Sequence, residues 1–167
     1  AGSGKDQHPT QALLDIYTLE RSLTHRGGID HKVIAMMGDL SRGRTARSLA
    51  YLMKNYQDVE LIFIAPPGFT MGQDILEHLD RHDIRHTHTT KLAHVIADLD
   101  AIYVTRIQSE HDAADGSRDI NLEDYTLSRS NINLMKDDAV IMHPLPRGPE
   151  LSPDIDDDPR AKYWRQE

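Results

Sequence analysis

Three short apolar runs constrain the fold of this chain more than any other feature. They occupy residues 33–37, 61–65 and 101–104, and none of them alternates with polar residues. A strand with one face in water alternates apolar and polar side chains, so a continuous apolar run indicates a strand that is covered on both faces. Strands of that kind belong to sheets that carry helices on each side.

The segments around these runs have apolar residues at helical spacing, so strands and helices alternate along the chain. We expect helices over residues 9–24, 44–55, 71–82 and 91–99. We expect strands over residues 32–37, 61–65, 84–87, 101–105 and 139–142, with 84–87 at an edge of the sheet. This order predicts an α/β fold with a doubly wound, mainly parallel five-stranded sheet and helices on both faces, in the Rossmann-like manner.

The composition fits a single domain and argues against several classes of function. The chain has 167 residues, a net charge of −8, a pI of about 5.6 and no cysteine. The acidic balance disfavours broad binding to nucleic acid or to an anionic membrane. The lack of cysteine excludes disulfides, a thiol nucleophile and thiolate metal sites. With no apolar run of membrane-spanning length and no signal-peptide pattern, we expect a cytoplasmic protein.

Two arginines lie in polar loops that follow predicted strands. Arg44 and Thr45 end the loop after the strand at 32–37, and Arg106 and Gln108 follow the strand at 101–105. Ligands of open parallel sheets bind outside the carboxyl ends of the strands, so both loops are expected to open on one rim. Two guanidinium groups there would bind a small molecule with two carboxylates, or with a carboxylate and a phosphate.

Two further motifs carry groups that suit an amide or carbonyl ligand. His8 stands near the expected start of the first helix and Gln11 lies one turn along, where the positive helix end disfavours protonation of the histidine. After the last strand, the sequence His-Pro-Leu-Pro-Arg begins at His143. Prolines hold such a segment extended, and its fixed carbonyl oxygens, including those of Pro144 and Leu145, suit an NH2 group. Each motif alone is also consistent with ordinary capping or a rigid strand exit.

The remaining histidines point to no metal site. His78 and His82 are four residues apart on one predicted helix, but the adjacent glutamate of a metalloprotease helix is missing. We expect these histidines on a solvated helix face, and we predict neither a metal nor another cofactor.

Taken in order, the motifs at 8–11, 43–45, 105–108 and 143–147 closely resemble the aspartate-binding domain of the aspartate carbamoyltransferase family. Ornithine carbamoyltransferases share the first motif but usually carry His-Cys-Leu-Pro at the last, where this chain has Pro144. The resemblance implies transfer of a carbamoyl group from carbamoyl phosphate to L-aspartate in pyrimidine biosynthesis, without a cofactor. It implies that His8 contacts the carbamoyl oxygen. Gln11, Pro144 and Leu145 would hold the carbamoyl NH2, and Arg44, Thr45, Arg106 and Gln108 would bind aspartate.

The resemblance also shows what this chain lacks. The family often has Lys and Arg where this chain has Ser109 and His111, and the Ser-Thr-Arg-Thr phosphate loop is absent. We therefore expect residues 1–167 to be one aspartate-binding domain of a longer protein, without the carbamoyl-phosphate domain and the terminal helix. The family implies a homotrimer, with regulatory chains in some members. Two alternatives stay open: a carbamoyltransferase domain for another amino acid, and a non-catalytic module that binds small dianions.

Overall fold

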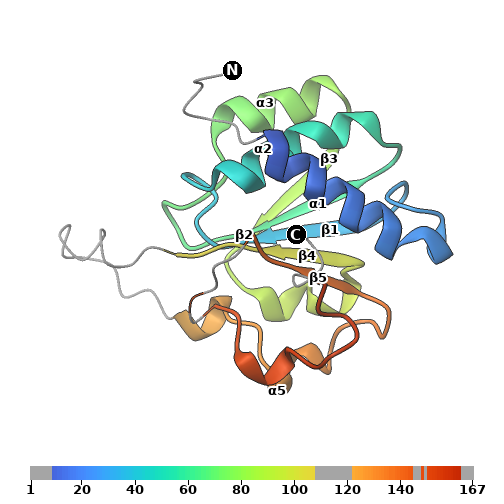
Figure 1. Ribbon diagram of the computed structural model, residues 1–167. Helices are drawn as coiled ribbons and strands as arrows, with labels where there is room; N and C mark the ends of the chain where they lie inside the picture. Colours follow the sequence, from blue (N-terminus) through green and yellow to red (C-terminus); the bar gives the residue numbers. More distant parts are fainter. Residues whose placement is uncertain (1–8, 108–121, 145–147, 149, 163–167) are drawn as a thin grey trace.

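A five-stranded parallel sheet forms the centre of the molecule (Figure 1). The computed structural model describes residues 9–107, 122–144, 148 and 150–162, and the structural statements below concern these residues. The sheet has the order β3-β2-β1-β4-β5, and every neighbouring pair is parallel. The strands are β1 (Val33–Met37), β2 (Glu60–Ile64), β3 (Arg85–Thr89), β4 (Ala101–Val104) and β5 (Val140–Met142). The predicted five-stranded, doubly wound fold is confirmed.

Helices cover both faces of this sheet. One face carries α1 (Pro9–Ser22), α2 (Arg44–Leu52) and α3 (Gln73–Arg81), which lie above the sheet in Figure 1. The other face carries α5 (Arg129–Ile132) and the 3-10 turns η3 (Leu92–His94) and η4 (Ile96–Asp98). Within β1, Ile34 packs into the first core and Ala35 into the second. This burial on both sides explains why the central strands have no polar alternation.

Two glycines end the first helical segment, as their dipeptide predicts. After α1 the chain makes one 3-10 turn, Thr24–Arg26, and then enters the left-handed region at Gly27 (φ 90°) and Gly28 (φ 82°). Residues with a Cβ rarely adopt this conformation, so glycine allows the sharp reversal that leads into β1.

The helix predicted over residues 91–99 is wrong. The segment instead forms η3 and η4, which are separated at Val95 (φ −125°, ψ −9°). Leu92, Ile96 and Leu99 are buried as a helical pattern would place them, so the apolar spacing was read correctly. The segment must nevertheless cross from β3 to β4 within few residues, and the β-branched Val95 is less favourable in a helix interior than at this non-helical break.

The two sheet edges differ. The side chains of β3 are mostly exposed, which confirms its predicted edge position. At the other edge, Ile141 donates its N–H to the carbonyl of Arg160 (2.8 Å), and Lys162 donates to the carbonyl of Ile141 (2.9 Å). The segment around Ala161 therefore adds a short parallel bridge to β5.

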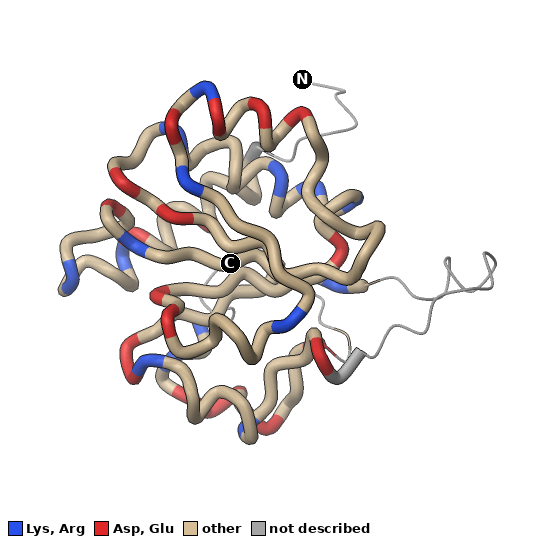
Figure 2. Tube along the Cα trace, turned by 180° about the vertical axis from the view of Figure 1, so that it is seen from behind, with Lys and Arg blue, Asp and Glu red and all other residues tan. Residues whose placement is uncertain are grey.

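Charges of both signs are spread over the described chain. Figure 2 shows acidic and basic residues interspersed around the trace rather than gathered on one face. No helix in the described part of the chain is both long and apolar enough to cross a bilayer.

Candidate functional site

The carboxyl ends of β1 and β4 lie side by side, and the two arginine loops begin there. Met37 is in register with Val104, and the Thr105 N–H donates to the Met37 carbonyl at 2.8 Å. Gly38, with φ 129°, lies so close to β4 that a Cβ would stand 2.3 Å from Thr105 Oγ1. The predicted placement of both loops on one rim of a parallel sheet therefore holds, and we call this rim the carboxyl edge.

The loop before Arg44 is built around one buried carboxylate. Asp39 accepts hydrogen bonds from the Ser41 N–H (3.2 Å), the Ser41 hydroxyl (2.7 Å) and the Arg42 N–H (3.2 Å). The Gly43 N–H donates to the Asp39 carbonyl (3.1 Å), and α2 begins at the next residue. The loop thus has a fixed backbone that delivers Arg44 to the first turn of α2, with its side chain exposed.

Arg106 lies over a second loop that also closes on a buried acid. Glu150, 6% exposed, accepts from His143 Nε2 (2.7 Å) and from the Gly148 N–H (2.8 Å) through its Oε1 atom. Burial alone would raise the pKa of Glu150, but the hydrogen bonds from His143 and the backbone outweigh it and hold the pKa below its usual value. Arg106 Nε lies 3.4 Å from the place that a Cβ at Gly148 would take. Pro144, half-buried, belongs to the same loop.

A third buried acid lies beneath the first turn of α1. Gln11 donates from Nε2 to Asp15 Oδ1 at 3.0 Å, and Asp15 has no exposed surface. Tyr103 of β4 is 1% exposed, and its hydroxyl borders both Asp15 and Thr45. Burial raises the pKa of this phenol well above its ordinary value, and the charge of Asp15 adds to the effect. Polar groups therefore connect α1, β4 and α2 under the carboxyl edge.

The structure places five of the eight predicted site residues at or next to the carboxyl edge. Adjacent strands bring the Arg44 and Arg106 loops together, and Pro144 follows β5 beside β4. Gln11 bonds to Asp15, and the Tyr103 hydroxyl lies near both Asp15 and Thr45. The other three, His8, Gln108 and Leu145, lie outside the described residues.

Sequence reasoning assigned no site role to three of the buried residues that shape this edge, Asp15, Tyr103 and Glu150. Asp15 had a readable signal, because it interrupts the apolar face formed by Ala12 and Leu19 with an acid. Tyr103 had none, since it is one more apolar-looking position in a buried strand. Glu150 had none either, because only the folded loop brings it to His143.

His78 of α3 acts as a packing group. His78 is buried, stacks on Tyr51 with ring centroids 4.0 Å apart, and places Nε2 3.1 Å from the Tyr51 carbonyl. The expected solvated face is therefore wrong for His78, although His82 is exposed. Among the described residues, no group of three or more His, Asp or Glu side chains is arranged to hold a metal.

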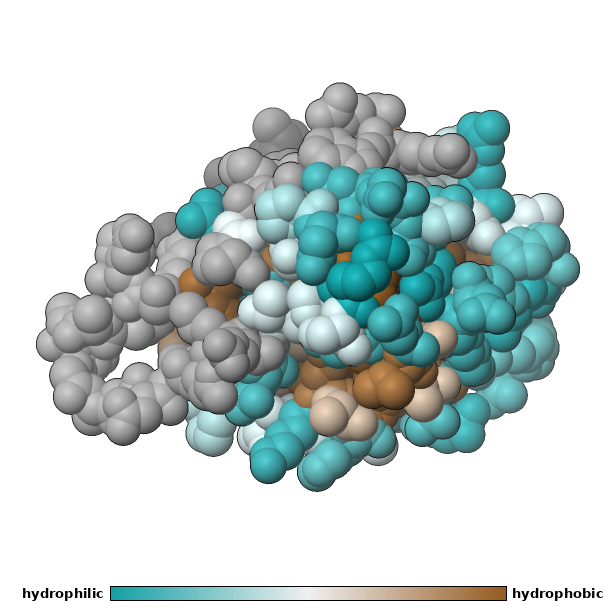
Figure 3. Space-filling model, turned by 90° about the horizontal axis from the view of Figure 1, so that it is seen from below, coloured by the Kyte–Doolittle hydropathy of each residue, from teal (hydrophilic) through white to brown (hydrophobic). Residues whose placement is uncertain are grey.

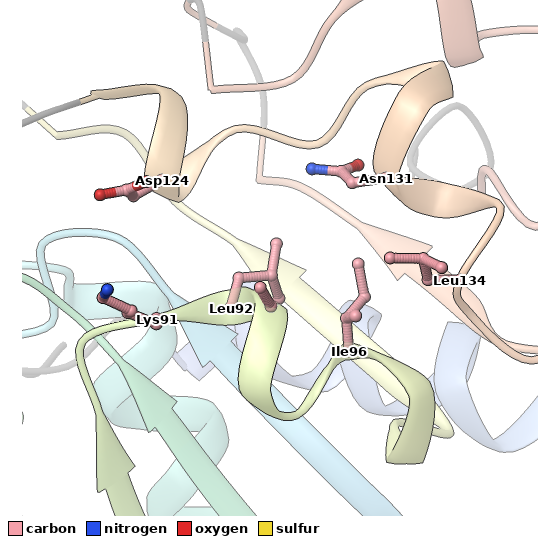
Figure 4. Close-up of a pocket in the computed structure, with 7 residues that line it drawn as sticks. Lys91, Leu92, Ile96, Asp124, Asn131 and Leu134 are labelled. Atoms are coloured by element: carbon pink, nitrogen blue, oxygen red, sulfur yellow. The ribbon is translucent and has the colours of Figure 1, made fainter.

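A small apolar hollow lies on the opposite face of the sheet from α1. It has a volume of about 150 Å³, and Figure 4 shows Leu92 and Ile96 reaching toward Asn131 and Leu134 across it. Figure 3, which views the molecule from this side, shows an apolar patch bordered by hydrophilic residues. Pockets that enclose small molecules are usually larger, at roughly 300–1,000 Å³. We therefore take the carboxyl edge as the candidate site.

Comparison with known proteins identifies the family of this chain. The family profile "Aspartate/ornithine carbamoyltransferase, Asp/Orn binding domain" matches residues 30–167. The chain belongs to the aspartate/ornithine carbamoyltransferase family. A chloroplastic aspartate carbamoyltransferase 1 of Pisum sativum is 41% identical over 171 residues, covering 99% of this chain and 42% of the relative. The aspartate carbamoyltransferase catalytic subunit of Methanocaldococcus jannaschii is 40% identical over 166 residues, covering 99% of this chain and 53% of the relative.

Solved structures of carbamoyltransferases share the fold. The catalytic subunit of M. jannaschii aspartate transcarbamoylase aligns with a TM-score of 0.84 and 38% identity, covering 99% of this chain and 53% of that chain. Aspartate transcarbamoylase from Trypanosoma cruzi in complex with carbamoyl phosphate aligns with a TM-score of 0.87 and 38% identity, again covering 99% and 53%. The present chain therefore spans about half the length of the carbamoyltransferases that it matches.

Proposed function

We propose that this domain is the aspartate-binding half of an aspartate carbamoyltransferase. In the proposed reaction the amine of L-aspartate attacks the carbamoyl carbon of carbamoyl phosphate, giving N-carbamoyl-L-aspartate and phosphate for pyrimidine biosynthesis. The family match and the relatives named as aspartate carbamoyltransferases support this assignment. An aspartate transcarbamoylase from T. cruzi, solved in complex with aspartate and phosphate, aligns with a TM-score of 0.84 and 37% identity, covering 99% of this chain and 51% of that chain.

The observation that carries the proposal is the pair of arginine loops on neighbouring strands. Arg44 and Arg106 are both exposed and follow β1 and β4, whose ends are tied together at Gly38 and Thr105. Guanidinium groups bind carboxylates through paired hydrogen bonds, so two of them on one rim suit a dicarboxylic amino acid. Thr45 and Gln108 complete the proposed aspartate site.

On the carbamoyl side, the proposal assigns His8 to the carbonyl oxygen. Gln11 and the carbonyl groups of Pro144 and Leu145 take the NH2 group. Attack of the amine forms a tetrahedral oxyanion, which expels phosphate, and a donor at the carbonyl oxygen stabilises that charge. Positioning of two bound substrates supplies much of the remaining rate, and the chemistry requires no cofactor.

We further propose that the domain works with a carbamoyl-phosphate domain, which the sequence of these 167 residues does not supply. Two observations support this proposal. The chain spans about half the length of the relatives that it matches, and the outer surface of α1 carries exposed apolar side chains. Leu13 and Tyr17 are each 62% exposed there, and Leu14 is 40% exposed. Apolar side chains gathered on one helix face suit an interface with the companion domain. The proposal extends to a cytoplasmic homotrimer, with a regulatory chain as an additional partner.

Carbamoyl-aspartate production tests the proposal. We expect no measurable turnover from the purified 167-residue chain at millimolar substrates, and clear turnover once the chain is joined to the carbamoyl-phosphate half of a relative. In the joined enzyme, Arg106→Ala should raise the KM for aspartate at least tenfold, because a charge-assisted hydrogen bond contributes about 1.5–3 kcal/mol. The preference of this variant for aspartate over other amino acids should also fall.

Arg85→Ala is the matched control, since Arg85 is an exposed arginine of edge strand β3 and pairs with Asp58. It should leave the aspartate KM unchanged. Turnover by the chain alone would overturn the need for a second domain. A joined enzyme that carbamoylates another amino acid in preference to aspartate, or that binds dianions without turnover, would establish one of the alternative functions instead.

A further inference from the structure

We propose that Asp15 is a positioning residue that fixes which end of the Gln11 side-chain amide faces the substrate. The inference rests on the proposed function, in which Gln11 holds the carbamoyl NH2 group. It concerns a residue that is buried in α1 and lies one helical turn beyond Gln11.

The side-chain amide of Gln11 has two chemically different ends. Gln11 can present either an oxygen, which accepts hydrogen bonds, or an NH2 group, which donates them. A carboxylate only accepts, so the 3.0 Å contact with Asp15 Oδ1 assigns the NH2 end to Asp15. The oxygen of Gln11 is then left for the other side. An NH2 group of the substrate needs such an acceptor, whereas the reversed amide would set NH2 against NH2.

Asp15 is enclosed in the protein interior, where the surrounding residues restrict its position. It has no exposed surface and lies on the face of α1 that packs onto the sheet. The hydroxyl of Tyr103, itself 1% exposed, borders Asp15 on one side and Thr45 on the other. An acid on this apolar face costs free energy that an isosteric leucine would not. Because an acid stands here despite that cost, we assign Asp15 a function in orienting the Gln11 amide.

The experiment uses the enzyme in which this domain is joined to a carbamoyl-phosphate half. Asp15→Leu keeps the shape but removes both acceptors, while Asp15→Asn keeps one oxygen. We expect Asp15→Leu to lower kcat/KM for carbamoyl phosphate by about tenfold or more, as for loss of a hydrogen bond to a charged group. Asp15→Asn should fall between Asp15→Leu and the unvaried enzyme.

A double-mutant cycle separates positioning from a purely structural role. If Asp15 acts through Gln11, adding Asp15→Leu to a Gln11→Ala enzyme should cause no further loss of kcat/KM. Additive losses would overturn the inference. Asp15→Asn gives the same test if the leucine variant does not fold.

Thr18→Val supplies the matched control. Thr18 is another buried polar residue of α1, and its hydroxyl donates to the Leu14 carbonyl at 3.0 Å. The kcat/KM for carbamoyl phosphate should stay unchanged in this variant, and an equal fall in kcat/KM for Thr18→Val and Asp15→Leu would refute positioning by Asp15. Failure of the unvaried enzyme to make carbamoyl-aspartate would instead refute the proposed function, so the two failures are distinguishable.

Discussion

Removal of the Glu150 carboxylate should destabilise the domain strongly and loosen the loop beside Arg106. Glu150 is 6% exposed, and one of its oxygens receives hydrogen bonds from both His143 and the Gly148 N–H. Glu150→Ala leaves both donors without this acceptor in a buried site. Leaving a buried donor without its hydrogen-bond partner costs about 1–3 kcal/mol, so the loss of this acceptor for two donors costs roughly 2–6 kcal/mol. For a domain of this size, about 1 kcal/mol lowers Tm by roughly 2–4 °C, so a fall near 10 °C is expected.

Thermal unfolding followed by circular dichroism measures this loss directly. Glu150→Gln keeps the shape and a neutral acceptor, so it should lose only about 1–2 kcal/mol. Asp157→Ala is the control, because Asp157 pairs with Arg129 at the surface with its side chain 85% exposed. Exposed ion pairs contribute about 0–1 kcal/mol. If Glu150→Ala destabilised the chain no more than Asp157→Ala, the reasoning that the buried acid closes this loop would be refuted.

Two further predictions concern stability. Gly38→Ala should cost more than about 2 kcal/mol in urea unfolding, because its Cβ would collide with Thr105 at φ 129°, whereas Gly27→Ala at φ 90° meets no atom within 4 Å and should cost only about 1–2 kcal/mol. Equal losses would show that the close approach at the carboxyl edge does not matter. Arg160 lowers the pKa of Asp158 from 3.8 to about 2, so the stability that this carboxylate contributes is present above its unfolded pKa and is lost as the pH falls from about 5 to 2. Asp158→Asn should reduce the difference in unfolding free energy between pH 6 and pH 3 by about 1–2 kcal/mol, and an unchanged difference would contradict the assignment.

The sheet could be predicted because its sequence signal is local. An apolar run such as 101–104 reports burial on both faces, and the helix periods between runs imply parallel crossovers. In the segment 91–99, the local apolar pattern was not sufficient to predict the type of helix. Its apolar residues are buried as expected, but the spacing of buried positions did not distinguish a continuous helix from two 3-10 turns broken at Val95.

The edge at which the site lies was predictable for a related reason. In a parallel sheet, the loops that follow the strands all begin at the same edge, so the loops that carry Arg44 and Arg106 could be placed on one rim from the sequence alone. The groups that fix their loops could not. Glu150 meets His143 only through a turn of the backbone, and Tyr103 meets Asp15 only after α1 packs on β4. Such contacts depend on tertiary structure rather than on any local pattern.

The distribution of exposure supports the proposal that this domain works with a companion domain. The acids that shape the carboxyl edge are buried: Asp15 is 0%, Asp39 3% and Glu150 6% exposed. Arg44 and Arg106 are exposed, so the loops are preformed while the guanidinium groups remain in water. A charge pair in water gains little, because solvent screens it and side-chain entropy opposes it. Tight binding of a dicarboxylate would therefore require a second surface that excludes water over these arginines, and an isolated domain should bind aspartate only weakly.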